Sequence, residues 1–560
     1  MLLIIECILV IVFVAVALIN PRFGESGFRR IESAMAKWAR KRRTSVLVVG
    51  GLTLVIRALL IPILPIPVPA VHDEFSYLLM ADTFAHGRMT NPTHPMWIHF
   101  ETFHEIQKPT YASMYYPGQG AFLAIGQAAF GDPFWGVWLS NGLMCGAICW
   151  MLQGWLPPFW ALLGGFLALI RLGIFSYWMN SYWGGSVAAL GGALVLGAFP
   201  RIIREPRLRE SMLMGLGFVM VASSRPYEGL FFGLAVLIAL LLSKARKVSY
   251  GTFARQILAP LGFVLMVGAA TSGIYFWRVT GTPFRTPFQV NIATYNPIPY
   301  FPWQTVKAIP HYDHEAMRKF YFEWWGPIYQ FGRTHPFVQL LVKICVFWFF
   351  FIGVAFSLPL LGLCFVLPRG FSLAHISRRT RLLLAICGFA LLGSFLPVNF
   401  NPHYAAAITG GIYALILIAM QNIRRWRPGQ RPIGIALVRA VFAIIVISLF
   451  AAVVPQLRTS HVPRMATWYS PIITNSYRAE IIRQLDNETG QHLVIVRYDP
   501  NHLPPTEWVF NQANIDASRI VWARDMGAER NAELINYFKD RHVWLLRPDK
   551  VPPRLSEYSD

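Results

Sequence analysis

The dominant pattern along the chain is a series of long apolar runs separated by short polar segments. Most runs have about 17 to 25 residues, the length that an α-helix needs to cross roughly 30 Å of hydrocarbon. The pattern predicts about twelve transmembrane helices, near residues 1–20, 45–66, 134–153, 159–177, 186–200, 211–224, 228–243, 257–277, 340–367, 382–397, 403–421 and 433–454. Several runs are short for a full span, so one or two pairs can be re-entrant.

The pattern changes after the last apolar run. Short β-rich stretches predict strands at 493–498, 519–523 and 542–546, and an amphipathic stretch predicts a helix at 529–538. Two polar segments, 67–133 and 278–335, interrupt the apolar runs and are rich in aromatic residues, proline and histidine. The chain is therefore divided into an N-terminal helix with a basic segment at 1–44, a transmembrane domain at 45–454 and a small α/β domain at 455–560.

Composition supports a membrane protein. Hydrophobic residues make up 55% of the 560 residues and charged residues only 14%, and the mean hydropathy is +0.44. A soluble protein of this size must cover its surface with more polar groups than that. The predicted fold class is a polytopic α-helical membrane protein with a small α/β C-terminal domain.

The positive charge is distributed unevenly. The formal net charge is +22, but the segment from Pro455 to Asp560 has 13 Lys/Arg against 13 Asp/Glu. The excess gathers in 21–43 and in alternate later loops, which the positive-inside rule places in the cytoplasm. Both long loops and the C-terminal domain are then outside. The charge therefore reflects topology, and no nucleic-acid partner is expected.

Two further features bear on the compartment. The first apolar run has no Lys or Arg before it and many after it, which predicts a retained helix, not a cleaved signal peptide. All six cysteines lie in apolar runs, so the sequence predicts neither a disulfide framework nor a thiolate zinc site outside.

Candidate chemistry begins at His72-Asp73-Glu74, just beyond the outer end of the second predicted helix. Adjacent carboxylates at this place in an apolar protein suggest acid–base chemistry. A Tyr116-Pro117-Gly118 segment precedes the next span.

This arrangement resembles the GT-C glycosyltransferases. An Asp-Glu pair opens the first large outer loop, a Tyr-Pro-Gly segment closes it, many further helices follow, and a soluble domain ends the chain. The bacterial branch with protein O-mannosyltransferase-like, family 39-like and aminoarabinose-transferase-like enzymes is most similar, over roughly residues 45 to 420. The resemblance implies sugar transfer from a polyprenyl-phosphate carrier to an acceptor hydroxyl outside a bacterial plasma membrane. It also implies inversion, no metal or other cofactor, and an acidic residue of the first loop as base.

The hypothesis is that Asp73 is this base, because one carboxylate within hydrogen-bond reach can take the proton of the attacking hydroxyl. Glu74 would orient a loop residue or the acceptor, and His72 would tune the pair. The alternative is that Asp73 only caps a helix that starts at Glu74, since Asp is a preferred N-cap residue.

A phosphate-bearing donor also needs cations. Arg57 and Arg171 lie about 18 to 20 Å along their predicted helices, in the outer third of the bilayer, where a buried charge is a candidate for function. The alternatives are snorkelling to headgroups or pairing within the helix bundle.

Tight outer turns supply the remaining candidates. Arg225 and Glu228 could contact phosphate and sugar hydroxyls or pair with one another; His403, with Tyr404 beside it, could donate to phosphate or belong to a simple polar turn. Lys108 and Tyr116 are further candidate substrate contacts of the first loop. The aromatic turn 176–185 suits a sugar, an isoprenoid or an interfacial belt equally well. This turn lacks the second acidic residue that often occurs there in the GT-C class.

A metal site is not expected, because His86, His94, His99 and His104 do not match zinc-protease spacing. The predicted partners are a polyprenyl-phosphate sugar, a lipid, glycan or protein acceptor, and the bilayer. Two alternative functions stay open. One is a transporter, although long one-sided loops do not suit repeated halves; the other is a membrane-anchored protein whose tail binds glycan.

Overall fold

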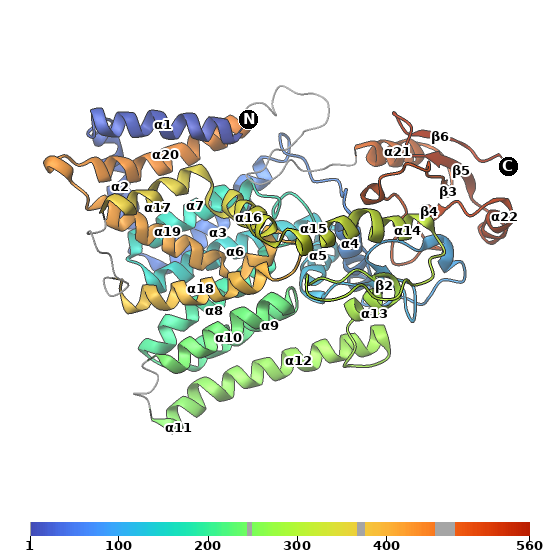
Figure 1. Ribbon diagram of the computed structural model, residues 1–560, viewed down its shortest axis with the longest axis horizontal. Helices are drawn as coiled ribbons and strands as arrows, with labels where there is room; N and C mark the ends of the chain where they lie inside the picture. Colours follow the sequence, from blue (N-terminus) through green and yellow to red (C-terminus); the bar gives the residue numbers. More distant parts are fainter. Residues whose placement is uncertain (1, 244–248, 367–375, 454–475, 560) are drawn as a thin grey trace.

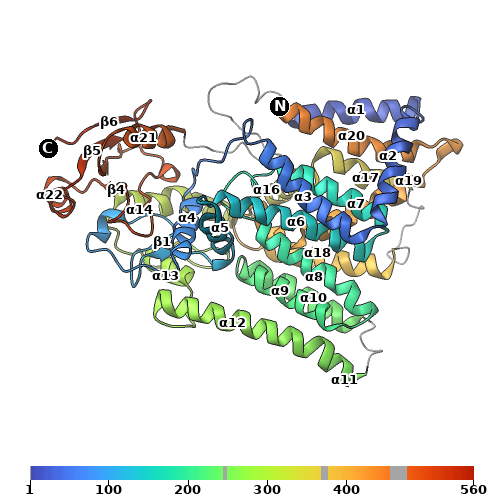
Figure 2. The same cartoon turned by 180° about the vertical axis from the view of Figure 1, so that it is seen from behind.

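The computed structural model describes residues 2–243, 249–366, 376–453 and 476–559. A bundle of roughly parallel helices forms one end of the molecule, and a small sheet domain forms the other, with two long loops between them (Figure 1). Figure 2 shows the same division from behind.

Helices make up most of the chain. In order they are α1 (Leu2–Ile19), α2 (Glu25–Ala39), α3 (Arg42–Leu59), α4 (His72–Ala85), η1 (Trp97–Phe100), α5 (Pro117–Phe130), α6 (Phe134–Trp155), α7 (Pro158–Ala168), η2 (Leu169–Ile174), α8 (Ser186–Arg204), α9 (Leu208–Ala222), α10 (Pro226–Leu242), α11 (Tyr250–Phe253), η4 (Ala254–Leu258), α12 (Ala259–Thr280), α13 (Pro287–Tyr295), α14 (Glu315–Lys319), η5 (Phe320–Trp325), α15 (Gly326–Thr334), α16 (Pro336–Phe347), η6 (Trp348–Ile352), α17 (Gly353–Val366), α18 (Arg378–Phe395), η8 (Pro402–Ile408), α19 (Thr409–Arg424), η9 (Pro428–Gln430), α20 (Ile433–Val453), α21 (Ser476–Asn487), η11 (Pro504–Thr506) and α22 (Ala528–Tyr537).

Each of the twelve predicted spans coincides with a helix, but the structure does not confirm twelve crossings. Within the described residues six helices are long and apolar enough to cross a membrane, and the helices at 3–19, 158–174 and 226–242 are apolar but shorter. The other three, α3, α9 and α18, begin with charged turns that shorten their apolar length. Length and composition therefore support a membrane protein with at least six candidate spans.

The largest apolar core lies inside the bundle, where α6, α8 and α19 each contribute several fully buried side chains. Small residues bring these elements close. A methyl group at Gly192 of α8 would lie 1.8 Å from the Ala407 carbonyl oxygen, so only glycine permits this contact between α8 and η8. Such close backbone approach is typical of helix packing in membranes.

The two long loops fold into short elements at one end of the bundle. The first contains α4, η1, the two-stranded hairpin of β1 (Glu105–Ile106) and β2 (Ala112–Ser113), and α5. The second contains α13, α14, η5 and α15. Phe103 of the first loop packs with Phe320 and Tyr321 of the second.

The C-terminal domain is a four-stranded sheet in the order β4-β3-β5-β6. β3 (His492–Val496) pairs in parallel with β4 (Ile520–Arg524) and β5 (His542–Arg547), and β5 pairs antiparallel with β6 (Arg554–Glu557). The three predicted strands and the helix α22 are confirmed. Sequence reasoning did not foresee α21 or β6. The predicted domain boundary at 455 lies outside the described residues.

This domain rests on the first long loop. The ring of Phe510 stacks on Phe75 of α4 with a centroid separation of 4.0 Å. The Ala513 amide donates to Asp82 Oδ2 at 2.8 Å, and the Arg524 guanidinium donates to the Glu101 carbonyl at 2.6 Å. The tail is therefore part of the layer that covers α4.

Candidate active site

The first turn of α4 holds the candidate carboxylates. The helix begins at His72, with Val71 in extended conformation as its N-cap residue. Asp73 is thus the second residue of the helix and not its cap. The alternative that Asp73 serves only as an N-cap is not what the structure shows.

Glu74 performs the capping. Its Oε2 accepts hydrogen bonds from the amides of Ala70 at 2.9 Å and Val71 at 3.2 Å, and its Oε1 accepts from the Tyr182 amide at 2.9 Å. Burial raises the pKa of Glu74, and the three amide bonds act against that rise. Both oxygens are occupied, so Glu74 is a positioning residue that ties α4 to the turn at 176–185. The catalytic assignment of Glu74 is corrected accordingly, whereas its expected role in orienting a loop agrees with these contacts.

The β1–β2 hairpin brings two more polar groups to Asp73. Glu105 pairs with Ser113 across the hairpin, so His104, just before β1, and Tyr115, just after β2, emerge at the same end. Ser76 of α4 fixes this end by donating to the His104 carbonyl at 2.7 Å. His104 has a φ of +61°, a left-handed conformation that few non-glycine residues adopt.

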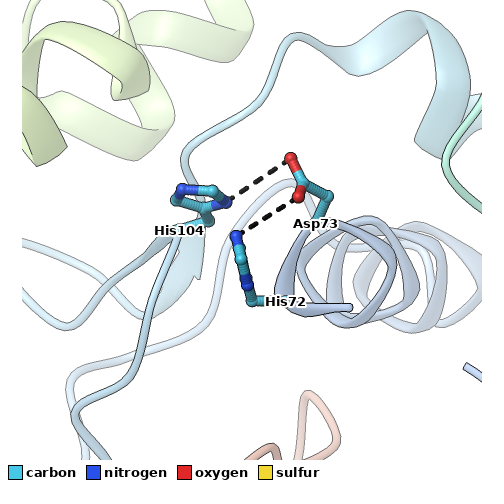
Figure 3. A group of neighbouring side chains, drawn as sticks. All are labelled: His72, Asp73 and His104. Carbon is cyan, nitrogen blue, oxygen red and sulfur yellow. Dashed lines mark ion pairs between the residues drawn. The ribbon is translucent and has the colours of Figure 1, made fainter. Parts of the chain in front are cut away.

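Three side chains meet the Asp73 carboxylate. The Tyr115 hydroxyl donates to Oδ1, His104 Nδ1 lies 3.5 Å from Oδ1, and His72 Nε2 lies 3.4 Å from Oδ2. Figure 3 shows both imidazole rings turned toward the carboxylate. His104 Nδ1 is also 2.8 Å from the Tyr115 oxygen. Because that hydroxyl gives its single proton to Asp73, its oxygen accepts from His104 Nδ1–H.

The electrostatics keep Asp73 ionised. Burial acts to raise the pKa of Asp73, but the imidazoles of His104 and His72 and the Tyr115 hydrogen bond outweigh it and hold that pKa well below its usual range. Burial lowers the pKa of His72 to about 3, so His72 is neutral at physiological pH. The site therefore presents one partly buried carboxylate that is charged and held by donors.

The surroundings of this carboxylate come from both long loops and the tail. The His72 ring lies 5.8 Å from Phe103 and 4.9 Å from Phe320, edge to face. Glu507 of the C-terminal domain lies within electrostatic range of His72 and is itself paired with Arg524. Apolar rings thus pack against His72, the residue next to Asp73.

A narrow pocket opens next to this cluster, one helical turn along α4. It is lined by Tyr77, Gln119, Trp183, Gly184, Gly185, Val187, Ala188, Ser224, Arg225 and His403, and it has room for about one water molecule, about 10 Å³. The Tyr77 ring stacks on the Tyr115 ring with a centroid separation of 4.5 Å. Because Tyr115 bonds Asp73, this stacking connects the pocket with the carboxylate.

Arg225 is the cation of this pocket. Its guanidinium lies over the Tyr404 ring, 4.6 Å from the centroid, and within the described part of the chain it makes no ion pair. The expected alternative, a mutual pair with Glu228, is therefore absent among these residues, although Glu228 is buried nearby. Gln119 Oε1 and Ser224 Oγ are also buried, and neither has a hydrogen-bond partner within the described ranges of the chain. The pocket thus offers one cation and unused polar groups.

The structure places His403 and Tyr404 in the same region. His403 lines the pocket, and its Nδ1 lies 2.7 Å from the Tyr177 hydroxyl. Both His403 and Tyr404 interact electrostatically with Asp73 and with Arg225. One polar region therefore contains Asp73, Arg225 and His403, although more than 300 residues separate the first from the last in the sequence.

Arg57 and Arg171 lie elsewhere, and their predicted contact with phosphate is corrected. Arg57 is fully buried and donates to Asn180 Oδ1 at 3.1 Å and to the carbonyls of Leu64 at 2.9 Å and Pro65 at 3.3 Å. Arg171 donates to the carbonyl of Ile352 at 2.6 Å and to that of Phe350 at 3.0 Å. Both arginines bond within the protein, which is the alternative considered for them. Arg57 donates to carbonyls just beyond the end of its own helix α3, and Arg171 donates to carbonyls of η6, because such backbone acceptors need donors.

Two other candidates also lie outside the pocket. Lys108 is exposed, and its Nζ lies 4.0 Å above the Trp97 ring. Tyr116 is the N-cap residue of α5, and its ring packs beside Phe276 and Phe288. Its neighbour Tyr115 is the tyrosine that contacts Asp73.

His72, Asp73 and His104 could also hold a divalent cation, because one ligand atom of each lies within 4.8 Å of the others. In the arrangement described, Asp73 Oδ1 and His104 Nδ1 share the Tyr115 hydroxyl, which an ion would have to displace. The donor set of two imidazoles and a carboxylate fits a transition metal or zinc.

No protein-family model and no curated protein sequence matches this chain. Solved structures do resemble it. An oligosaccharyltransferase of Archaeoglobus fulgidus, tethered to an acceptor peptide with an NVT sequon, is 11% identical over 90% of this chain and 68% of that chain, with a TM-score of 0.45. ArnT of Cupriavidus metallidurans in the apo state is 13% identical over 88% of this chain and 92% of that chain, with a TM-score of 0.47.

A further structure holds the archaeal oligosaccharyltransferase AglB of Archaeoglobus fulgidus with an inhibitory peptide and a dolichol-phosphate. It is 12% identical over 90% of this chain and 69% of that chain, with a TM-score of 0.40. These neighbours are GT-C glycosyltransferases, the class that the sequence resembles. At such identities the likeness concerns the course of the chain and leaves the chemistry of this site to its own residues.

Sequence reasoning missed His104, Tyr115 and Tyr77. Nothing in the local sequence marks His104 among the histidines of the first loop, because its left-handed backbone and its register at the hairpin end appear only in the fold. Tyr115 is adjacent to the tyrosine that was chosen. Tyr77 follows Asp73 by four residues on a helix, and this spacing was the one available signal.

Proposed function

We propose that this protein is a membrane glycosyltransferase. It moves a sugar from a polyprenyl-phosphate carrier to an acceptor hydroxyl at the outer face of the membrane, with Asp73 as general base. One observation carries the proposal: a partly buried, ionised carboxylate held by His104, His72 and Tyr115 lies beside a pocket whose cation, Arg225, has no carboxylate partner among the described residues.

The reaction assigns a task to each group. Asp73 accepts the proton of the acceptor hydroxyl while that oxygen attacks C1 of the sugar, and the bond from C1 to the phosphate oxygen breaks. The polyprenyl phosphate leaves with the bonding pair. Attack from the face opposite the phosphate inverts the configuration at C1. Because Asp73 is already ionised, it is in the protonation state that a base requires.

Arg225 suits the leaving group. A guanidinium offers several N–H donors in a fork that matches phosphate oxygens, and a nearly dry pocket strengthens its attraction to the charge that develops there. Gln119 and Ser224 bring buried polar atoms that have no partner among the residues the structure describes, and His403 adds a ring nitrogen. Tyr115, which occupies Asp73 Oδ1, is replaced by the acceptor hydroxyl when substrate binds.

The position of a lipid-linked donor in the membrane also bears on the proposal. A polyprenyl chain stays in the bilayer, so its phosphate must be met at the border between lipid and water. The pocket is lined by Tyr77 and Gln119 of the first long loop and by Arg225 and His403 of the bundle. The positive-inside distribution of Lys and Arg supports an outer position for this loop. A bacterial plasma membrane is the expected location.

The test is sugar transfer by the purified full-length protein in proteoliposomes. A panel of radiolabelled polyprenyl-phosphate monosaccharides is offered with a lipid and glycan extract, and release of free polyprenyl phosphate is measured. We expect turnover with one donor and its loss in Asp73→Asn. The matched control is Asp132→Asn, in which the asparagine oxygen can still accept the Phe134 amide that Asp132 binds at 2.8 Å. Full turnover by Asp73→Asn would exclude the assignment, and movement of the intact labelled lipid without cleavage would instead indicate a transporter.

A further inference from the structure

The end of the bundle opposite the candidate site has a different charge and shape. Helix α2 runs across the ends of the bundle helices there and packs against α3 and α7 (Figures 1 and 2). Its three faces have distinct chemistry, and together they point to a second ligand.

The inner face of α2 is fixed to the bundle. Glu32 accepts hydrogen bonds from Arg424 at 3.0 and 3.1 Å and from Arg439 at 3.0 and 3.2 Å. Burial acts to raise the pKa of Glu32, but these two guanidinium groups lower it to about 2, so the pairs are charged at physiological pH. Phe28 lies under the Arg439 guanidinium, and Ala39 is fully buried. The orientation of α2 about its own axis is therefore set.

The opposite face carries free cations. Arg30 and Lys37 are seven residues apart, so they lie on one side of the helix, and Lys41 continues that row just beyond its end. All three are exposed, and among the described residues none of them makes an ion pair. With Arg29, Ser33, Ala34 and Trp38 they line a hollow of about 670 Å³. Arg29 alone of the four cations is paired, with Glu25 at 2.7 Å.

One flank of the helix is apolar and open. Ile31 and Trp38, also seven residues apart, are 53% and 61% exposed. A row of cations beside an open row of Ile and Trp is what a helix in the membrane interface presents, because the apolar side chains enter the acyl region and the cations reach the phosphates. A soluble anion would explain the cations but would leave Ile31 and Trp38 in water.

We propose that this hollow of α2 is a binding site for an anionic phospholipid headgroup of the cytoplasmic leaflet. Arg30, Lys37 and Lys41 bind the phosphate and the further anionic charge of the headgroup, and Trp38 and Ile31 contact its acyl chains. The site is independent of the sugar-transfer proposal, since it uses residues at the other end of the molecule. Each cation near an anionic membrane surface favours binding by about fivefold.

The experiment uses the full-length protein in nanodiscs of phosphatidylcholine with phosphatidylglycerol as the anionic probe. Spin-labelled phosphatidylglycerol and spin-labelled phosphatidylcholine are compared by the fraction of each that the protein immobilises. We expect a preference for phosphatidylglycerol of about fivefold or more, falling to near unity in Arg30→Gln/Lys37→Gln/Lys41→Gln. The matched control removes three exposed basic residues outside the hollow, Arg379→Gln/Arg381→Gln/Arg427→Gln, and should keep the preference.

Three results would overturn the proposal. One is equal immobilisation of the two lipids by the unmodified protein, which needs no variant and no assumption about folding. Another is an equal loss of preference in the control, which would mean diffuse charge and not a site. The third is displacement of the labelled lipid by millimolar inorganic phosphate, which would make the hollow a general anion site. The charge-conserving Arg30→Lys should retain the preference and so separates lost charge from lost structure.

Discussion

Asp73 and Glu74 are neighbours in sequence, yet their contacts differ, and exchanging each carboxylate for its amide tests the different roles that we propose for them. In the unmodified protein three backbone amides donate to the two carboxylate oxygens of Glu74. The Glu74→Gln side chain has only one oxygen that can accept them. Either the Tyr182 amide, or the amides of Ala70 and Val71, loses its acceptor and faces an NH₂ group. An unsatisfied buried donor costs about 1 to 3 kcal/mol, and the orientation that leaves only the Tyr182 amide unsatisfied costs least, so the expected loss of folding free energy is about 1 to 3 kcal/mol.

Asp73→Asn should behave in the opposite way. The asparagine oxygen can still accept from Tyr115, so folding stability should change by less than about 1 kcal/mol. Removal of a general base lowers turnover by about 10² to 10⁴, which corresponds to about 3 to 5 kcal/mol in the activation free energy.

The assay pairs two readouts on the same preparations. Thermal unfolding of the detergent-solubilised protein, followed by size-exclusion fluorescence, reports stability, and donor turnover in proteoliposomes reports catalysis. We expect Glu74→Gln to lower the unfolding temperature and Asp73→Asn to lower turnover alone. The reasoning is refuted if Glu74→Gln abolishes turnover at unchanged stability while Asp73→Asn stays active.

Four further predictions follow from the same geometry. Because the pKa of Asp73 lies below its usual range, the carboxylate stays ionised as pH falls, and kcat/KM should show no acid limb above about pH 4; a limb near pH 6 would assign the base to another group. Arg225→Gln should raise the KM for the lipid-linked donor by about tenfold or more and lower kcat, whereas Arg225→Lys should restore part of both, and unchanged kinetics would remove Arg225 from the phosphate site. Treatment with EDTA should leave turnover intact if Asp73 acts as a base, and a loss restored by Mn²⁺ or Zn²⁺ would instead assign the His72–Asp73–His104 cluster to a metal. Phe510→Ala should cost about 3 to 5 kcal/mol of packing against Phe75 and expose the first loop to protease, and an unchanged cleavage pattern would show that the tail does not brace α4.

The helices and the C-terminal strands could be predicted because they depend on local pattern. An apolar run of membrane length has few alternatives to a helix, since its backbone polar groups must bond within the segment. The β-rich stretches of the tail predict strands, and the structure has β3, β4 and β5 at these positions. The number of crossings could not be predicted, because helices such as α3, α9 and α18 combine charged turns with short apolar lengths.

For the candidate site, sequence alone located Asp73, Arg225 and His403 as unusual polar residues at the ends of apolar runs. Only the tertiary structure brought them together and gave Asp73 its partners, since Tyr115 and His104 reach it through the register of a short hairpin. It also separated Arg57 and Arg171, which serve backbone carbonyls inside the bundle, from Arg225, which lines a pocket. A sequence shows which side chains carry charge, but the partners that satisfy each charge come from segments hundreds of residues away, and these partners decide whether a charge is free to meet a substrate.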